Sequence, residues 1–417
     1  MAKPRVLYTT PILEHPPAGG PALRIENSIK ALHRVSELHV ISRVDPHYLG
    51  GAAAEAFYRS TAHIFMSSPS VTGTSDNYWI RMAQEKWRRP SAVRKDAEFV
   101  AAYMQRYGID ILWAGYGNIS FELIARVKAL VPSIKIVCDT DSVWSRFVLR
   151  KLPYVTSPRR RRRIEQAGRK KEEEERAWVN LCEVTTAVSD IDADYYRSLT
   201  NETERVHIFS NVIDVDSYLG VPPPPRGHKR PNIYLAGTFG NDGPMDQAAR
   251  WLVGNVFSHV QREIPDIHLY LVGALGDVSL TDLAGPHITI TGKLPSVLPY
   301  LRHADVAVVP LFFESGTRFK ILEAGACGIP IVSTTLGAEG LPLQNGKEIL
   351  IADEPEPFAA DIVRLIRDRP FAAQMAATCR GFVEENCGIP RLVREAQSIL
   401  DTLKASSDER PRSRRRN

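Results

Sequence analysis

The chain has 417 residues, of which 44% are hydrophobic and 24% are charged, and its formal net charge is +5. This length exceeds what one core normally holds and predicts two domains, while the composition excludes a largely disordered chain. The apolar runs fall short of the about 20 residues that cross a membrane, so any membrane contact would be peripheral. Five cysteines without CxxC spacing indicate neither a disulfide framework nor a zinc cage, and we expect a cytoplasmic protein.

Apolar runs rich in β-branched residues alternate with longer amphipathic stretches along the chain. This alternation predicts parallel sheets covered by helices on both faces, which is an α/β chain with two Rossmann-like domains. The predicted strands of the first half are Arg5 to Tyr8, Glu37 to Ser42, Ile109 to Trp113, Lys135 to Cys138 and Glu183 to Val188. Those of the second half are Asn232 to Gly237, His268 to Gly273, Ile288 to Thr291, Asp305 to Pro310, Ile331 to Ser333 and Glu348 to Ile351.

A proline-rich segment, Pro222 to Pro225, separates the two halves, because four consecutive prolines are stiff and unlike the inside of a core. We expect an N-terminal domain at 1–211, an interdomain linker at 212–231, a C-terminal domain at 232–385 and a final helix at 386–405. Residues 406–417 are rich in arginine and are predicted to form a disordered basic tail. Binding of this tail to anionic lipid or nucleic acid is the alternative.

The most informative stretch of the sequence runs from Pro310 to Leu341. A buried strand leads to a turn at Gly316, a helix follows to Ala326, and a second strand comes after it. Such a turn aims unpaired N–H groups at one point, which suits a phosphate group, and Arg318 and Lys320 add positive charge there. Glu323 lies one helical turn after Lys320, where it could accept hydrogen bonds from a ribose. The alternative is an exposed helix pair of little consequence.

The segment GTRFKILEAGACGIPIVSTTLGAEGL resembles the donor site of GT-B glycosyltransferases, specifically the retaining group 1 type called family 4. Many members have two glutamates eight positions apart, whereas Glu314 and Glu323 are nine apart here, so mainly the second is carried over. The resemblance implies two Rossmann-like domains facing a central cleft, an acceptor-side N-terminal domain, and a last helix that returns to it. It also implies that Arg318 and Lys320 are catalytic, because they stabilise the leaving diphosphate of a nucleotide sugar, with no required metal or cofactor.

Further candidate site residues follow strands of both halves. Donor binding is expected from Gly316, Thr317, Glu323, Thr238 and the Gly19-Gly20 turn, for which an ordinary surface turn is the alternative. Contacts to the acceptor or the sugar are expected from the remaining candidates, where helix capping or a solvated loop is the alternative. These candidates are His15, Asp139, Asp141 and Glu314.

The expected function is transfer of a sugar from a nucleotide-diphosphate sugar to an acceptor hydroxyl with retention, as a hexosyltransferase-like enzyme of polysaccharide or glycolipid assembly. A degenerate nucleotide-sugar-binding protein of the same fold is the alternative. The absence of GxGxxG after a strand and of GxxxxGK[ST] counts against a dehydrogenase and a P-loop nucleotidase. The expected partners are the donor and a sugar or lipid-linked acceptor, not nucleic acid. Tyr78 to Arg89 mixes aromatic and basic residues and could contact a membrane, or form an ordinary core helix.

Overall fold

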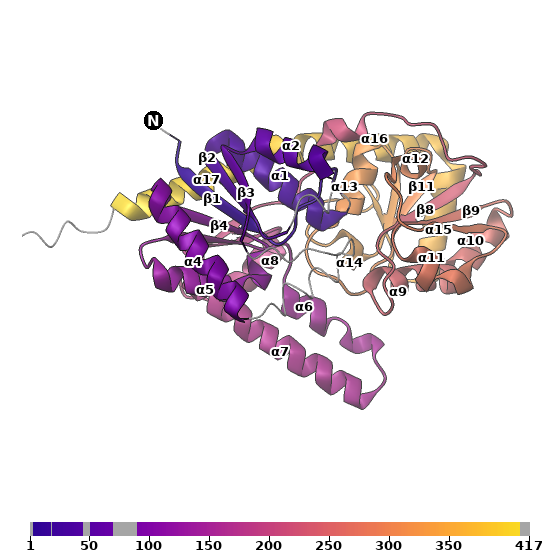
Figure 1. Ribbon diagram of the computed structural model, residues 1–417. Helices are drawn as coiled ribbons and strands as arrows, with labels where there is room; N and C mark the ends of the chain where they lie inside the picture. Colours follow the sequence, from indigo (N-terminus) through magenta and orange to yellow (C-terminus); the bar gives the residue numbers. More distant parts are fainter. Residues whose placement is uncertain (1–2, 18, 45–50, 70–89, 409–417) are drawn as a thin grey trace, which may run out of the picture. The chain divides into compact units, whose positions relative to one another are not determined.

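The computed structural model describes residues 3–17, 19–44, 51–69 and 90–408. By their contacts, these residues form two compact units (Figure 1). Unit 1 comprises 1–145, 165–211 and 389–417, and unit 2 comprises 146–164 and 212–388. Tyr78 to Arg89 and residues 409–417 of the predicted tail lie outside the described residues. Among the described helices, none combines the length and the apolar character that spanning a membrane requires.

Unit 1 contains a parallel sheet of seven strands in the order β3-β2-β1-β4-β5-β6-β7. Parallel strands need helical crossovers, and the helices of this unit cover both faces of the sheet. The strands are β1 (Arg5–Thr10), β2 (Glu37–Ser42), β3 (Ile64–Ser67), β4 (Ile111–Gly115), β5 (Lys135–Asp139), β6 (Val184–Ala187) and β7 (Val206–Ile208). The helices include α1 (Gly20–Val35), α2 (Gly51–Thr61), α4 (Pro90–Tyr107), α5 (Phe121–Leu130), α8 (Asp190–Arg197) and α17 (Ile389–Asp408).

Unit 2 contains a parallel sheet of six strands in the order β10-β9-β8-β11-β12-β13. The strands are β8 (Asn232–Ala236), β9 (His268–Val272), β10 (Ile288–Ile290), β11 (Val306–Val309), β12 (Ile331–Ser333) and β13 (Leu350–Ile351). Its helices are α9 (Pro244–Trp251), α10 (Ser258–Glu263), α11 (Gly276–Ser279), α12 (Leu298–Leu301), α13 (Phe319–Ala326), α14 (Thr335–Ala338), α15 (Pro355–Arg367) and α16 (Arg369–Asn386). The predicted α/β architecture with two parallel sheets is therefore confirmed.

Two helices connect the units along the chain, and they correct the predicted domain at 1–211. These are α6 (Trp144–Leu149) and α7 (Pro158–Leu181), and residues 146–164 belong to unit 2. Arg150 explains this assignment, because its guanidinium makes two bonds to the Glu339 carboxylate, of 2.7 and 2.8 Å. It also donates to the Glu314 carbonyl at 2.6 Å. A bidentate pair of this kind holds the segment in a defined geometry.

The predicted linker at 212–231 also needs a correction at its beginning. Ile213 and Tyr218 are buried in the hydrophobic core of unit 2 rather than lying in a loop. Tyr218 ends a short 3₁₀ helix, Val215–Tyr218, that brings its ring into that core. The proline-rich part after it remains at the surface, where Val221 is 61% exposed.

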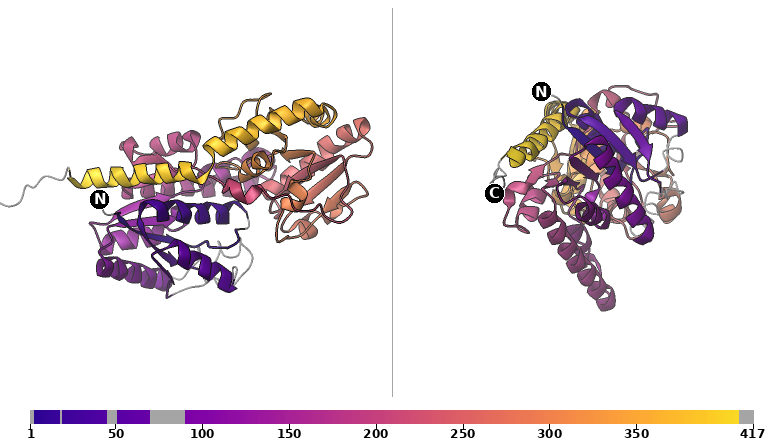
Figure 2. Two further views of the ribbon diagram at one scale, coloured as in Figure 1. Left: turned by 90° about the horizontal axis from the view of Figure 1, so that it is seen from above. Right: turned by 60° about the vertical axis from the view of Figure 1, so that its left-hand side comes forward.

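The final helix begins at Ile389 and continues to Asp408, three residues beyond the predicted end of 405. It packs along α1 in unit 1 (Figure 2). Buried apolar residues of α17, including Leu392, Ile399 and Leu403, form its inward face. Lys135, at the start of β5, donates to the backbone carbonyl of Leu403. Residues 406–408 therefore belong to a helix and not to the predicted tail.

Candidate functional site

The turn at Gly316 lies between β11 and α13 in unit 2, as the sequence predicts. Gly316 has φ 81°, a left-handed conformation that glycine adopts without strain. Arg318 is the N-cap residue of α13 and keeps an extended backbone with φ −98° and ψ 106°. The Arg318 side chain makes no capping hydrogen bond at this helix start. The local backbone therefore has the form that a bound anion requires.

Four charged side chains of this segment act on one another: Arg318, Lys320, Glu314 and Glu323. Arg318 is 4% exposed, and its Nη2 donates to the Leu336 carbonyl at 3.2 Å. Lys320, in the first turn of α13, is half-buried. Burial lowers the pKa of Lys320, while the carboxylates of Glu314 and Glu323 act in the opposite direction. A partly desolvated cation between two carboxylates is typical of a functional site rather than of an exposed helix pair.

Glu323 is held by a residue that the sequence did not point to. The Tyr218 hydroxyl donates a hydrogen bond of 2.9 Å to Glu323 Oε1. Burial raises the pKa of Glu323, and the Tyr218 hydrogen bond and the Lys320 charge oppose that rise. Tyr218 lies 105 positions away in sequence, so no local spacing could have identified it.

Two other candidates belong to the same unit. Thr317 is 8% exposed and follows Gly316 directly. Thr238 is exposed and comes two residues after β8, the strand that pairs with β11. The carboxyl ends of parallel strands meet at one edge of a sheet, which is where open α/β sheets bind ligands. Gly316, Thr317, Arg318, Lys320, Glu323, Glu314 and Thr238 therefore belong to one edge of the unit 2 sheet.

His15 and the two glycines lie between β1 and α1 in unit 1. Gly19 has φ 88° and caps α1, and Gly20 is the first residue of that helix. His15 Nδ1 lies 2.9 Å from Glu26 Oε2, and its ring stacks on Phe57 with centroids 3.9 Å apart. His15 is therefore a packed residue with a carboxylate partner and not the solvated loop histidine of the alternative.

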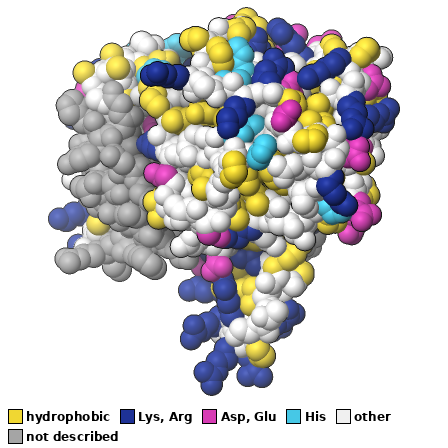
Figure 3. Space-filling model, turned by 90° about the vertical axis from the view of Figure 1, so that its right-hand side faces the viewer, with side chains coloured by type: hydrophobic (Ala, Val, Ile, Leu, Met, Phe, Trp, Pro, Cys, Tyr) yellow, Lys and Arg dark blue, Asp and Glu magenta, His cyan; other side chains and the backbone are white. Residues whose placement is uncertain are grey.

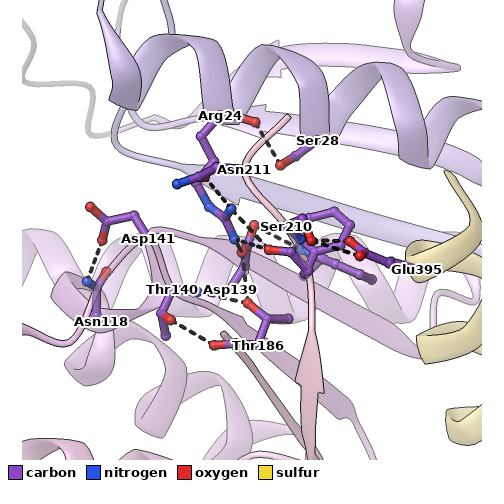
Figure 4. A network of polar contacts seen from close by, with 12 residues as sticks. Arg24, Ser28, Asn118, Asp139, Thr140, Asp141, Thr186, Ser210, Asn211 and Glu395 are labelled. Atoms are coloured by element: carbon purple, nitrogen blue, oxygen red, sulfur yellow. Dashed lines mark hydrogen bonds and ion pairs between the residues drawn. The ribbon is translucent and has the colours of Figure 1, made fainter. Parts of the chain in front are cut away.

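Asp139 occupies a closed polar network (Figure 4), and its predicted contact with an acceptor stays a prediction. Its side chain is fully buried and pairs with Arg24 Nη2 at 2.5 Å. The same carboxylate accepts from Thr186 Oγ1 at 3.0 Å and from Trp113 Nε1 at 3.3 Å. Because a buried ion pair needs such added hydrogen bonds, we assign Asp139 a structural role.

Arg24 is the partner that sequence reasoning missed. It also donates to Asn211 Oδ1 at 2.8 Å and to the Phe209 carbonyl at 3.2 Å. It comes from the second turn of α1, where it is 2% exposed. No break in an apolar face marked Arg24 in the sequence, because the residues three and four positions after it are the polar Asn27 and Ser28.

Asp141, two residues after Asp139, has a different environment. It is half-buried and accepts from Asn118 Nδ2 at 2.8 Å and from Trp144 Nε1 at 3.3 Å. Burial raises the pKa of Asp141, and the Asn118 hydrogen bond opposes that rise. Of the two aspartates, Asp141 is therefore the one whose carboxylate is partly accessible at the end of β5.

The comparisons with known proteins agree with this geometry. Residues 230–368 match the family model described as glycosyl transferases group 1. A D-inositol 3-phosphate glycosyltransferase of Paenarthrobacter aurescens is 30% identical over 128 residues, which are 27% of this chain and 31% of that protein. An uncharacterized 44.6 kDa protein in the cps region of Klebsiella pneumoniae is 22% identical over 149 residues, or 34% of this chain and 38% of that protein. The chain thus aligns with about a third of the length of these relatives.

Solved structures of similar fold cover nearly the whole chain. Anabaena HepE in complex with UDP and glucose has a TM-score of 0.64 at 13% identity, covering 96% of this chain and 99% of that one. Sucrose-phosphate synthase from Thermosynechococcus elongatus has a TM-score of 0.67 at 18% identity, covering 97% and 100%. The chain therefore has the GT-B glycosyltransferase fold. Residues 230–368, the part that matches the group 1 family model, carry the Gly316 turn.

Proposed function

We propose that this protein is a glycosyltransferase that moves a sugar from a nucleotide-diphosphate sugar to an acceptor hydroxyl with retention of anomeric configuration. The observation that carries the proposal is the Gly316 turn with Arg318, Lys320 and Glu323 around it, inside the segment that matches the family model. This arrangement combines a helix start, two cations and one carboxylate at the carboxyl edge of a parallel sheet.

Arg318 and Lys320 would stabilise the leaving diphosphate. Negative charge grows on this group as the glycosidic bond breaks, and fixed positive charge at that point favours the transition state over the ground state. Arg318 is buried and tied to the Leu336 carbonyl, so it need not reorganise during the reaction. In this proposal the two side chains and the start of α13 compensate the negative charge of the diphosphate, with no required metal or cofactor.

Glu323 would bind the ribose of the donor. Its carboxylate must be ionised to accept hydrogen bonds from two hydroxyls, and the Tyr218 hydroxyl and Lys320 both favour the ionised form. Tyr218 also fixes the orientation of the carboxylate. We take the leaving phosphate itself as the group that helps to deprotonate the acceptor, because no carboxylate of unit 2 is assigned as a nucleophile.

Features of the relatives suggest a donor and a setting to test first. UDP and UDP-glucose are bound to Anabaena HepE, whose fold this chain shares, so a uridine nucleotide is the first choice. The relative from the cps region of Klebsiella pneumoniae supports a role in polysaccharide or glycolipid assembly. The acceptor would then be a sugar or a lipid-linked sugar.

A basic group at the start of α7 supports peripheral association with an anionic membrane surface. Arg159, Arg160, Arg162 and Arg163 are exposed there, and Figure 3 shows basic side chains gathered at one end of the molecule. Positive charge at a helix start opposes the helix dipole, so anionic headgroups would compensate it.

A thermal-shift panel of UDP, GDP and ADP and their common sugars, with and without EDTA, tests the donor site. Stabilisation by one nucleotide family, unchanged by EDTA, is the expected result, whereas stabilisation only without EDTA would refute the metal-independent assignment. Stabilisation without product from any acceptor would favour the degenerate binding protein. The one observation for that alternative is the nine-residue spacing of Glu314 and Glu323.

A further inference from the structure

A second cluster of ligating side chains lies in unit 1, at the opposite edge of the sheet from the candidate residues. It consists of Glu37, His39 and His63, whose ligand atoms all lie within 4.8 Å of one another. Glu37 is the first residue of β2, and His63 comes directly before β3. His15, Asp139 and Asp141 follow the carboxyl ends of their strands. The cluster is therefore separate from the proposed glycosyl transfer.

Strand geometry explains why the three side chains converge. Residues two apart in a strand point to the same face, so Glu37 and His39 share one face of β2. The His63 N–H donates to the Leu38 carbonyl at 2.7 Å, which sets His63 beside them on the neighbouring strand. The parallel pairing of β2 with β3 brings His63 close to Glu37 and His39. The sequence alone does not show this, because His63 is far from Glu37 along the chain.

The distances suit a shared ion better than direct hydrogen bonds. His39 Nε2 lies 3.6 Å and His63 Nε2 lies 3.9 Å from Glu37 Oε1. These separations are long for hydrogen bonds. Two ligand atoms that each lie about 2.0–2.1 Å from a tetrahedral metal ion are about 3.4 Å apart, so a small contraction would close the site.

His39 is the residue that most clearly points to a ligand. Its side chain is 2% exposed, and in the described part of the chain its Nε2 atom has no hydrogen-bond partner. Its other nitrogen, Nδ1, lies 2.8 Å from the Tyr103 hydroxyl of α4. Metal-binding histidines usually have such a partner on the second nitrogen, which fixes the ring and the tautomer.

We propose that Glu37, His39 and His63 form a binding site for a divalent transition-metal cation of the zinc type. Two imidazoles and one carboxylate favour such an ion over Mg²⁺ or Ca²⁺, which prefer oxygen ligands throughout. Glu37 is 35% and His63 is 61% exposed, so solvent can supply the fourth ligand. The bound ion would tie β2 to the edge strand β3 and so stabilise unit 1.

Arg5 would compete with a metal ion for the Glu37 carboxylate. Its Nε atom lies 3.3 Å from Glu37 Oε1 and 3.4 Å from Oε2. A metal would need Oε1, on which both imidazoles converge, and would leave Oε2 to Arg5. Replacing Arg5 by glutamine removes a positive charge next to the ion, so Arg5→Gln is expected to bind the metal more tightly than the natural protein.

Isothermal titration with ZnCl₂, together with the absorption spectrum of the Co²⁺ form, tests the site. One ion per chain, a tetrahedral Co²⁺ spectrum and no binding of MgCl₂ are expected for the natural protein. His63→Ala should weaken Zn²⁺ binding by more than about tenfold and abolish that spectrum. Loss of a residue that only orients a ligand already lowers metal affinity by about tenfold or more, and loss of the ligand itself should lower it further. The exposed His63 can be replaced without disturbing the core, unlike His39.

His33→Ala is the matched control, because His33 is an exposed histidine on α1 that is not one of the three clustered residues. It should leave the titration unchanged. If His63→Ala binds Zn²⁺ as the natural protein does, or if the natural protein binds no Zn²⁺ at stoichiometric concentration, the proposal is overturned. Weaker Zn²⁺ binding by Arg5→Gln would contradict the geometry assigned to Glu37.

Discussion

The carboxyl edges of the two sheets carry charged residues in opposite physical states. In unit 1, Asp139 and Arg24 are buried and their hydrogen bonds go to other protein groups, as Figure 4 shows. In unit 2, Lys320 and Glu323 are half-buried, and burial moves their pKa values away from the usual range. A closed network maintains a fold, whereas partly desolvated charges at a glycine turn are the state that a ligand can complete.

The largest expected effect on stability comes from breaking the closed network. Asp139→Asn leaves the Arg24 guanidinium buried beside a neutral amide, and losing one partner of a buried ion pair costs about 3–5 kcal/mol of unfolding free energy. Urea denaturation of both proteins at neutral pH measures this loss. A change below about 1 kcal/mol would show that the pair is not isolated from water as described.

Asp141→Asn is the matched control for that variant. The Asn118 hydrogen bond at 2.8 Å can be kept, because the new side chain retains a carbonyl oxygen. Burial raises the pKa of Asp141, so its ionised form destabilises the fold at neutral pH, and this cost grows as pH rises above the usual value of 3.8. The neutral amide removes that cost, and unfolding free energy is expected to be unchanged or slightly higher.

The largest expected effect on activity comes from Lys320→Met. Removing one charge that stabilises the leaving diphosphate should lower kcat by about 10²–10³. Burial lowers the pKa of Lys320, so its charged form carries a desolvation cost at neutral pH that the methionine lacks. The melting temperature should therefore stay the same or rise while turnover falls, which steady-state kinetics and thermal unfolding measure together.

Lys347→Met is the control for Lys320→Met, because it removes one positive charge of unit 2 outside the candidate site. Lys347 is 58% exposed and pairs with its neighbour Glu348 at the surface of unit 2. Such a pair contributes little, so this variant should keep both kcat and the melting temperature. Equal kcat values for Lys320→Met and the natural protein would refute the assignment of Lys320 to the diphosphate.

Tyr218→Phe tests the residue that holds Glu323 and should have a smaller effect. The Tyr218 hydrogen bond opposes the rise in the pKa of Glu323, so its removal should raise that pKa further. Donor binding needs the ionised carboxylate and weakens as pH falls through this pKa. The acidic limb of the pH profile of 1/KM for the donor should therefore move to higher pH. Tyr300→Phe, on a half-buried ring of the same unit, should leave the profile unmoved.

The periodic pattern of the sequence predicted the architecture. It did not reveal short strands or contacts between residues that are far apart in the sequence. All eleven predicted strands overlap observed strands, among them β1 and β9, which are buried almost throughout. The strands β3 and β7 were missed because they have four and three residues and lie at the edges of the sheet. A short edge strand buries one face at most and carries little periodic signal.

The candidate site shows the same division between local and distant information. The Gly316 turn and the start of α13 follow from residues within one short segment, and the structure forms them as predicted. The Tyr218 contact with Glu323 and the Arg24 pair with Asp139 join residues 105 and 115 positions apart. Such pairs are set by how strands are ordered in a sheet, which a single sequence does not encode as a local pattern.

The smallest expected effect concerns residues 146–164. Its measurement tests where the boundary between the two units lies. Arg150→Ala removes a half-buried bidentate pair with Glu339 and a bond to the Glu314 carbonyl. The loss of unfolding free energy should be about 1 kcal/mol or less, because the pair is partly hydrated. Hydrogen exchange should nevertheless quicken in 150–157, where this contact orders the chain, and remain unchanged in β5 of unit 1. Faster exchange in β5 but not in 150–157 would mean that this segment is held by unit 1 instead.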